Sequence, residues 1–136
     1  MWLLLFFVFI ASIISSVVAV VLSLDCESSQ VYVKIMKKTA NYASEESFKI
    51  LSGSTVAYTS PTLVDNQVRT LEVCLPASTN SQYSLEMNDS YGDSWTDGGW
   101  IEVYGINGNM AFKGMMAEGR TETHPISLYA PINKSG

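Results

Sequence analysis

Residues 83–104 read YSLEMNDSYGDSWTDGGWIEVY. Apolar and polar residues alternate over 83–87 and again over 100–104, which is the pattern of half-buried β-strands. Between them, residues 88–99 hold three aspartates at a spacing of four and three glycines. A long loop inside a compact domain usually serves a bound ion or ligand. The stretch therefore predicts two strands joined by a functional acidic loop.

The chain after Leu24 continues with short strands and polar turns. Alternation or short apolar runs mark strands over residues 31–36, 68–75 and 125–129. Two further pairs of strands flank turns: 48–50 and 56–58 lie around the turn 52–54, and 101–103 and 110–112 lie around the turn 106–109. No window after the leader shows a sustained helical pattern. We therefore expect an all-β fold of about eight strands, an antiparallel, jelly-roll-like β-sandwich.

The strand pattern contains an internal repeat. Residues 31–75 and 83–129 each run strand, loop, hairpin and strand. Ser47–Ile50 matches Trp100–Val103 in pattern, and Val56–Tyr58 matches Met110–Phe112. Two four-strand pseudo-repeats would build the sandwich. The second differs chiefly by a longer loop that holds Asp93 and Asp97, so function is expected in that loop.

The N-terminal segment predicts export. No charged residue occurs before Asp25, so all 8 basic and 13 acidic residues follow the apolar run. Small residues end this run, and residues 1–23 are predicted to be a signal peptide. The segment is also long enough to remain as a membrane anchor. The sandwich domain is assigned to 24–130 and a flexible tail or linker to 131–136. Both alternatives place the domain in the secreted fraction or at the cell surface.

Two cysteines, Cys26 and Cys74, follow the leader. In an exported chain an even number of cysteines favours a disulfide, and two buried thiols are the alternative. Asn88 and Asn133 begin glycosylation sequons. The first lies in the acidic loop and is expected to be unused.

The charge balance limits the partners of the domain. The net charge of −5 with scattered lysines is unlike a nucleic-acid-binding protein. It also lacks the basic patch that holds proteins on anionic lipid. Membrane contact is therefore expected only if the N-terminal segment is not cleaved.

The acidic loop is the predicted metal site. Asp89, Asp93, Asp97 and Asn88 supply the hard oxygen ligands that Ca²⁺ prefers, and the glycines let the backbone fold around an ion. Zinc is disfavoured because the chain has a single histidine and both cysteines are expected to be paired. The alternative is a solvated acidic turn, in which aspartate and glycine serve turn chemistry alone.

The loop also carries a resemblance to a known family. The run Asp89-Ser90-Tyr91-Gly92-Asp93-Ser94-Trp95, followed by Gly98-Gly99, resembles the D-S-Y-G-D-G-W motif of secreted and cell-surface proteins of protists, algae and some bacteria. The chain departs from this motif at Ser94, where the family usually has glycine. The resemblance is strong around the loop and weaker elsewhere. It implies an extracellular, non-catalytic, β-rich module with a cation-bound loop.

Three aromatic residues surround the loop, and each is a candidate for ligand contact. Tyr91, Trp95 and Trp100 would offer a platform on which sugar rings stack. Trp100 starts a strand, so packing into the sandwich is the favoured alternative for it. Trp95, in the middle of the loop, is the better candidate for a ligand contact.

The sequence thus predicts a calcium-dependent extracellular binding or adhesion module whose partner is a glycan or surface protein. One alternative is a self-associating building block of a surface coat or filament. Another is an accessory domain or pro-segment of a secreted hydrolase. Enzymatic activity is not expected, because His124 is the single histidine and no nucleophile or zinc-protease motif occurs.

Overall fold

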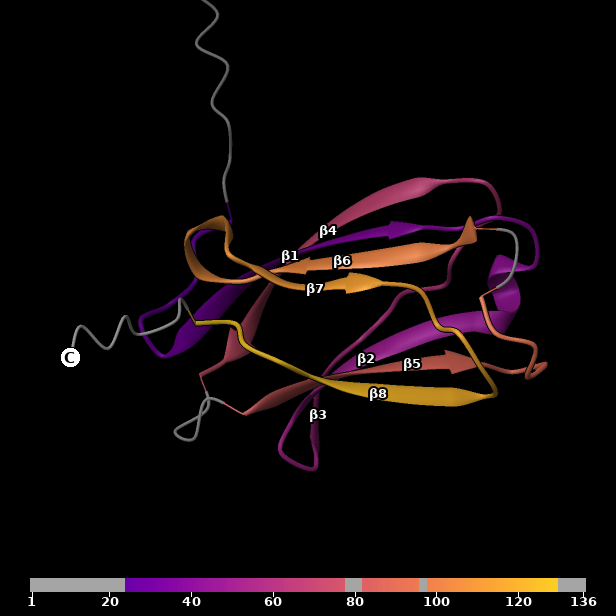
Figure 1. The fold of residues 1–136 in the computed structure, drawn as a ribbon. Helices are drawn as coiled ribbons and strands as arrows, with labels where there is room; N and C mark the ends of the chain where they lie inside the picture. Colours follow the sequence, from indigo (N-terminus) through magenta and orange to yellow (C-terminus); the bar gives the residue numbers. More distant parts are fainter. Residues whose placement is uncertain (1–23, 78–81, 96–97, 130–136) are drawn as a thin grey trace, which may run out of the picture.

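The computed structural model describes residues 24–77, 82–95 and 98–129, so the predicted signal segment and tail lie outside the described part. Within it, eight strands and two short 3-10 helices follow one another (Figure 1). The strands are β1 (Gln30–Lys38), β2 (Glu46–Ser52), β3 (Thr55–Thr59), β4 (Val68–Pro76), β5 (Tyr83–Asp89), β6 (Trp100–Tyr104), β7 (Met110–Gly114) and β8 (Thr121–Ile126). The helices are η1 (Ala43–Glu45) and η3 (Ile106–Gly108). Neither of these described helices has the length and apolar character needed to span a bilayer.

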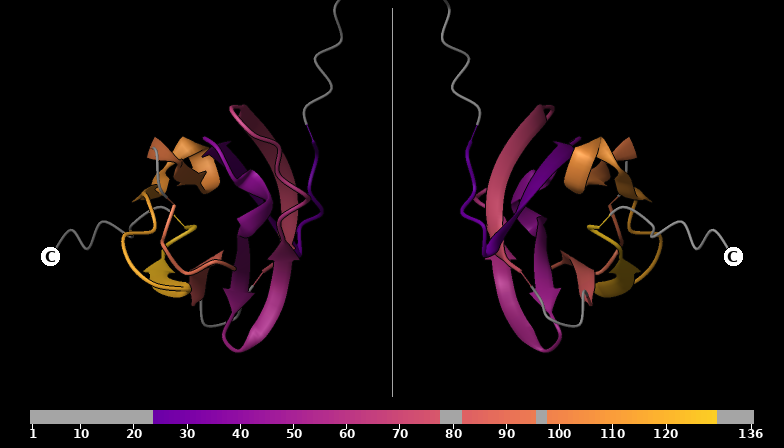
Figure 2. Two further views of the ribbon diagram at one scale, coloured as in Figure 1. Left: turned by 90° about the vertical axis from the view of Figure 1, so that its right-hand side faces the viewer. Right: turned by 90° about the vertical axis from the view of Figure 1, so that its left-hand side faces the viewer.

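The strands form two antiparallel four-stranded sheets that lie face to face (Figures 1 and 2). Sheet A has the order β4-β1-β6-β7, and sheet B has the order β3-β2-β5-β8. The hairpins β2–β3 and β6–β7 each stay within one sheet, whereas every other pair of consecutive strands crosses between the sheets. This arrangement confirms the predicted eight-stranded antiparallel β-sandwich.

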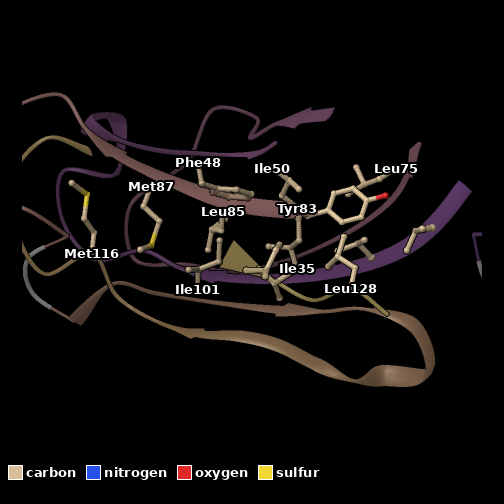
Figure 3. Close-up of a cluster of buried hydrophobic side chains, with 14 of the residues drawn as sticks. Ile35, Phe48, Ile50, Leu75, Tyr83, Leu85, Met87, Ile101, Met116 and Leu128 are labelled. Carbon is tan, nitrogen blue, oxygen red and sulfur yellow. The ribbon is translucent and has the colours of Figure 1, made fainter. Parts of the chain in front are cut away.

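One apolar core fills the space between the sheets (Figure 3). Alternate residues of the central strands point inward, and most of them are fully buried, because side chains on a strand alternate between its two faces. Ile35 and Ile101 of sheet A pack in this layer with Phe48 and Leu85 of sheet B. Each such side chain stabilises the fold by about 1.5–3 kcal/mol relative to its exposed state.

The topology contains the predicted internal repeat. Each strand of β1–β4 has an equivalent, in order, among β5–β8. When every strand of sheet A is replaced by its equivalent, the strand order becomes β8-β5-β2-β3, which is the order of sheet B in reverse. Irregularities in pairing also repeat. The register of β2 against β3 shifts between Ile50 and Leu51, and the register of β6 against β7 shifts at the equivalent Val103 and Tyr104. Each half of the chain therefore gives two strands to each sheet.

The last strand differs from the prediction. The sequence predicts it at 125–129, but β8 spans Thr121–Ile126 and pairs with β5 at the edge of sheet B. Its inward positions include Glu122 and His124, which stay partly exposed at this edge. Polar residues are tolerated there, so the strand lacks the hydrophobic alternation on which the prediction depends. Leu128, beyond the strand, still reaches the core and is 0% exposed.

The predicted disulfide joins Cys26 to Cys74, with Cα atoms 5.5 Å apart and a sequence separation of 48. It ties the segment before β1 to strand β4. A covalent link of this span restricts the unfolded chain, because the loop that it closes is long.

Removal of this bond is expected to lower stability without changing the fold. The variant Cys26→Ser/Cys74→Ser should lose about 4 kcal/mol of unfolding free energy, measured by urea unfolding followed by circular dichroism. The unmodified protein in reducing agent is the control and should show the same loss. Equal urea midpoints for the oxidised protein and the variant would contradict this account.

Candidate functional site

One end of the sandwich interior is charged instead of apolar. The inward-facing series Val33, Ile35 on β1 continues to Lys37, which is 0% exposed. The corresponding series on β2 ends in Glu46, and the series on β5 ends in Asp89, both buried. Three neighbouring strands therefore place charged side chains at the same end of the core, where the β1–β2 and β5–β6 connections meet (Figure 1).

Lys37 is the centre of this polar end. Its Nζ forms an ion pair with Glu46 Oε2 and donates a hydrogen bond to the Lys38 carbonyl oxygen at 2.8 Å. The same ammonium group lies 3.8 Å from the ring centroid of Trp95. A buried lysine is strongly unfavourable unless it is paired and hydrogen-bonded, and a cation over an indole face adds to the compensation. These three contacts together hold Lys37 inside the protein.

Trp95 closes the core over this pair. The indole is 1% exposed, and its Nε1 donates to the Asn88 carbonyl oxygen at 3.1 Å. Because the ring is fixed at both its face and its N–H, the residues between 88 and 95 fold back over the end of the sandwich. Sequence patterns do not show this, since the loop has no periodicity that would mark an inward residue.

Burial shifts the pKa values of both members of the ion pair. It lowers the pKa of Lys37, and the hydrogen bond and charge of Glu46 offset only part of that effect. Burial also raises the pKa of Glu46, which Lys37 partly offsets and the carboxylates of Asp89 and Asp65 increase further. Negative charge around Glu46 thus extends beyond the pair itself.

Next to Glu46 of the ion pair lies an acidic cluster. One carboxylate oxygen from each of Glu45, Asp89 and Asp93 lies within 4.8 Å of the other two. Glu45 belongs to η1, Asp89 ends β5, and Asp93 lies in the following loop. The cluster runs from a buried aspartate through a half-buried glutamate to an exposed aspartate. It is therefore anchored in the fold on one side and open to solvent on the other.

The loop backbone is fixed around Asp89. The Gly92 N–H donates to Asp89 Oδ1 at 2.5 Å, and the Ser90 N–H donates to the Glu45 carbonyl oxygen at 2.9 Å. Gly92 has φ +94°, and a Cβ there would lie 2.9 Å from Arg120 Cγ. Arg120 in turn donates to the Ser90 carbonyl oxygen. Glycine is thus required at this position both by its dihedral angle and by the arginine packed against it.

A surface depression of about 360 Å³ opens beside the cluster, lined by Tyr42, Glu45, Tyr91 and Asp93. The two tyrosines are exposed, at 64% and 69%. Two aromatic rings therefore flank two of the three clustered carboxylates at the solvent side.

The structure unites some predicted ligands and separates others. Asp89 and Asp93 come together as expected. Asn88 lies on the opposite face of β5, where its side chain bonds Glu86 at 3.1 Å and Thr121 at 3.0 Å. The alternation of a strand requires this, since consecutive residues point to opposite faces. Asp97, like the Asn133 sequon, lies outside the described residues.

The aromatic residues require a correction. The sequence favours Trp95 as the ligand contact, but its ring is buried and Lys37 lies over it. Tyr91 is exposed and stays available. Trp100 does not pack into the core, although its position at the start of a strand favours that prediction. Its neighbour Ile101 points inward and is 0% exposed, so alternation turns Trp100 to the outer face of sheet A.

Three site residues were missed from the sequence: Lys37, Glu46 and Glu45. For the first two a signal existed, because Lys37 and Glu46 stand at inward positions of strands whose other inward residues are apolar. Glu45 joins the cluster through the pairing of Glu46 with Asp89 between β2 and β5. That pairing is a tertiary contact that no local pattern shows.

Comparison of the chain with protein-family models, with curated proteins and with solved structures found no match.

The buried ion pair predicts a strong effect of single substitutions. Lys37→Met leaves Glu46 buried without its partner and should lower the unfolding free energy by about 3–5 kcal/mol. The variant Lys37→Met/Glu46→Leu removes both charges and should recover most of this loss. Urea unfolding of the single and double variants measures the difference. If the double variant is no more stable than the single one, the two charges are not energetically coupled.

The raised pKa of Glu46 predicts a pH dependence with a definite sign. The folded state holds this proton more tightly than the unfolded chain, so protonation favours folding. The contribution is fully present below the ordinary pKa of 4.5 and is lost as the pH rises through the higher folded-state value. Relative to Lys37→Met/Glu46→Leu, the unfolding free energy of the unmodified protein should therefore fall as the pH rises above 4.5. A relative rise over this range would show the opposite shift.

Proposed function

We propose that this protein is an extracellular, non-catalytic binding module that takes up Ca²⁺ at the cluster of Glu45, Asp89 and Asp93. The observation that carries the proposal is the convergence of three carboxylates from separate segments on one point. Three such groups repel one another, and a divalent cation relieves that repulsion.

The dimensions of the cluster suit calcium. Ca²⁺ takes oxygen ligands at about 2.3–2.6 Å, so two ligands of one ion lie at most about 5 Å apart. The clustered oxygens fall within 4.8 Å of one another, which satisfies that limit without any movement. Asp93 is exposed, so water can complete the six to eight ligands that calcium takes. The donor set is oxygen only, which disfavours zinc.

Several observations support an extracellular location. The disulfide Cys26–Cys74 is the kind of bond that persists in oxidising compartments. The apolar N-terminal segment, which carries no charged residue, also supports secretion or surface display. In this proposal the ion fixes the β5–β6 loop against η1 and so holds Tyr91 and Tyr42 at the rim of the depression. The module would then serve adhesion by binding a glycan or surface protein.

Calcium titration tests the proposal. At a calcium concentration about 100 times the dissociation constant, binding stabilises the folded state by about 2.7 kcal/mol, equivalent to about 10 °C in melting temperature. Extracellular calcium modules have dissociation constants of about 10⁻⁴–10⁻³ M, which sets the range to be scanned. The melting temperature should rise with calcium and return to its starting value in EGTA.

Matched variants separate a specific site from general screening of charge. Asp93→Asn and Glu45→Gln should each remove most of the calcium-dependent rise. Glu118→Gln, which neutralises an exposed carboxylate outside the cluster, should leave it intact. A melting temperature that ignores calcium, or an equal response in all three variants, would overturn the proposed site.

A further inference from the structure

The outer face of sheet A carries side chains that the fold itself does not need. Its outward positions form rows across the strands, read from the pairing registers. From one end to the other, these rows are Val68, Lys38 and Trp100; then Thr70, Met36, Glu102 and Lys113; then Glu72, Lys34, Tyr104 and Met110; and finally Cys74 with Tyr32. Aromatic and charged residues therefore gather on this face, which we call the aromatic face.

The internal repeat supplies a control for this face within the same chain. Lys38 lies opposite Trp100, and the equivalent pair in sheet B is Asn88 opposite Ser47. The same correspondence places Ser84 where sheet A has Lys34. The remaining equivalents are Gln82 for Tyr32, Leu51 for Tyr104 and Glu86 for Met36.

The same strand arrangement is thus built in sheet B with polar residues and one leucine, and with no aromatic ring, at these positions. The fold does not require aromatic rings or additional lysines on an outer face. Their presence on sheet A alone points to a role in contact with a partner.

The aromatic side chains of this face are held in place before any partner arrives. The Tyr104 hydroxyl donates to Glu102 Oε2 at 2.6 Å, and Lys34 Nζ lies 4.9 Å from the Tyr104 ring centroid. The Tyr32 hydroxyl donates to Glu72. Side chains that are fixed in the free protein lose little conformational entropy on binding, which favours a contact through this face.

The charge of the aromatic face is opposite to that of the whole chain. Three lysines stand on it against two glutamates, whereas the chain carries −5. Glu102 is already paired with Lys113 at 2.9 Å. Within the described residues, Lys34 and Lys38 form no ion pair with a carboxylate. Two ammonium groups beside aromatic rings therefore remain available to an anionic partner.

We propose that the aromatic face binds an anionic polysaccharide, with a sugar ring stacked on Trp100 and acidic groups of the polymer paired with Lys34 and Lys38. A pyranose ring presents C–H groups to an aromatic face, and its hydroxyls bond readily to charged side chains. The inference rests on the binding role proposed above, but it uses none of the three clustered carboxylates.

The composition of the face favours a polysaccharide over a protein partner. Protein interfaces are depleted of lysine and glutamate at their centre, where water is excluded. Here Lys34 and Glu102 occupy the two middle rows, between the rows that hold Trp100 and Tyr32. A hydrated polymer tolerates charges at the centre of its site, whereas an apolar protein surface does not.

Affinity electrophoresis in native gels tests this proposal. The purified protein is run with polygalacturonate, an anionic polymer, or with hydroxyethylcellulose, a neutral one, in the gel. EGTA is present throughout, so failure of the calcium site cannot be mistaken for failure of this face. Retardation by polygalacturonate alone, weakening as salt is added, is the expected result.

The variants copy residues from the equivalent positions of sheet B, which already sustain the fold. Trp100→Ser should weaken binding about tenfold, and Lys34→Ser should weaken it about fivefold. Lys49→Ser removes a lysine from the outer face of sheet B and should have no effect. Melting temperatures close to that of the unmodified protein show that the variants fold.

Four results would overturn the assignment of this face. The first is an absence of retardation, the second is equal retardation by the neutral polymer, and the third is equal binding by Lys34→Ser, Trp100→Ser and the Lys49→Ser control. Binding of a protein through this face without any polysaccharide binding would also overturn it.

Discussion

The burial of one ammonium group governs the charged end of this sandwich. Lys37 stands where its strand would otherwise place an apolar residue, and its charge must be compensated inside the protein. Glu46 supplies the counter-ion and Trp95 supplies a ring face. Because Trp95 is drawn inside, the loop before it folds back over the sandwich. Asp93 then comes to lie beside Glu45 and Asp89, which the pairing of β2 with β5 already brings together.

The site arises where the two halves of the chain stop resembling each other. In the repeat, Lys37 corresponds to Met87, Thr39 to Asp89 and Glu46 to Gly99, by the pairing registers. A Cβ on Gly99 would lie 3.1 Å from Glu46 Oε1, so the glycine leaves room for the carboxylate of the other half. The scaffold is thus shared by both halves, and each charged residue of the site occurs in one half only.

The fold was predictable from the sequence to the extent that its strands are buried on one face. Central strands such as β1 and β5 alternate clearly, whereas the edge strand β8 has polar inward residues and was misplaced. For the site, the sequence identifies the acidic loop but not the residues that pack around it. The contact of Glu45 with Asp89 depends on which strands pair, and the burial of Trp95 depends on a lysine from β1. Both are long-range contacts, and local periodicity carries no information about them.

The exchange of strands between the two halves has a consequence for the origin of the fold. Each sheet joins strands of both halves, so neither half is a domain by itself. A chain of half this length would expose the inner faces of its strands, and it would recover a closed core only by associating with a second copy about a two-fold axis. Such a homodimer, fused after gene duplication, would have this topology. Its two ends would at first have been identical, and fusion would have left each of them free to acquire a separate role.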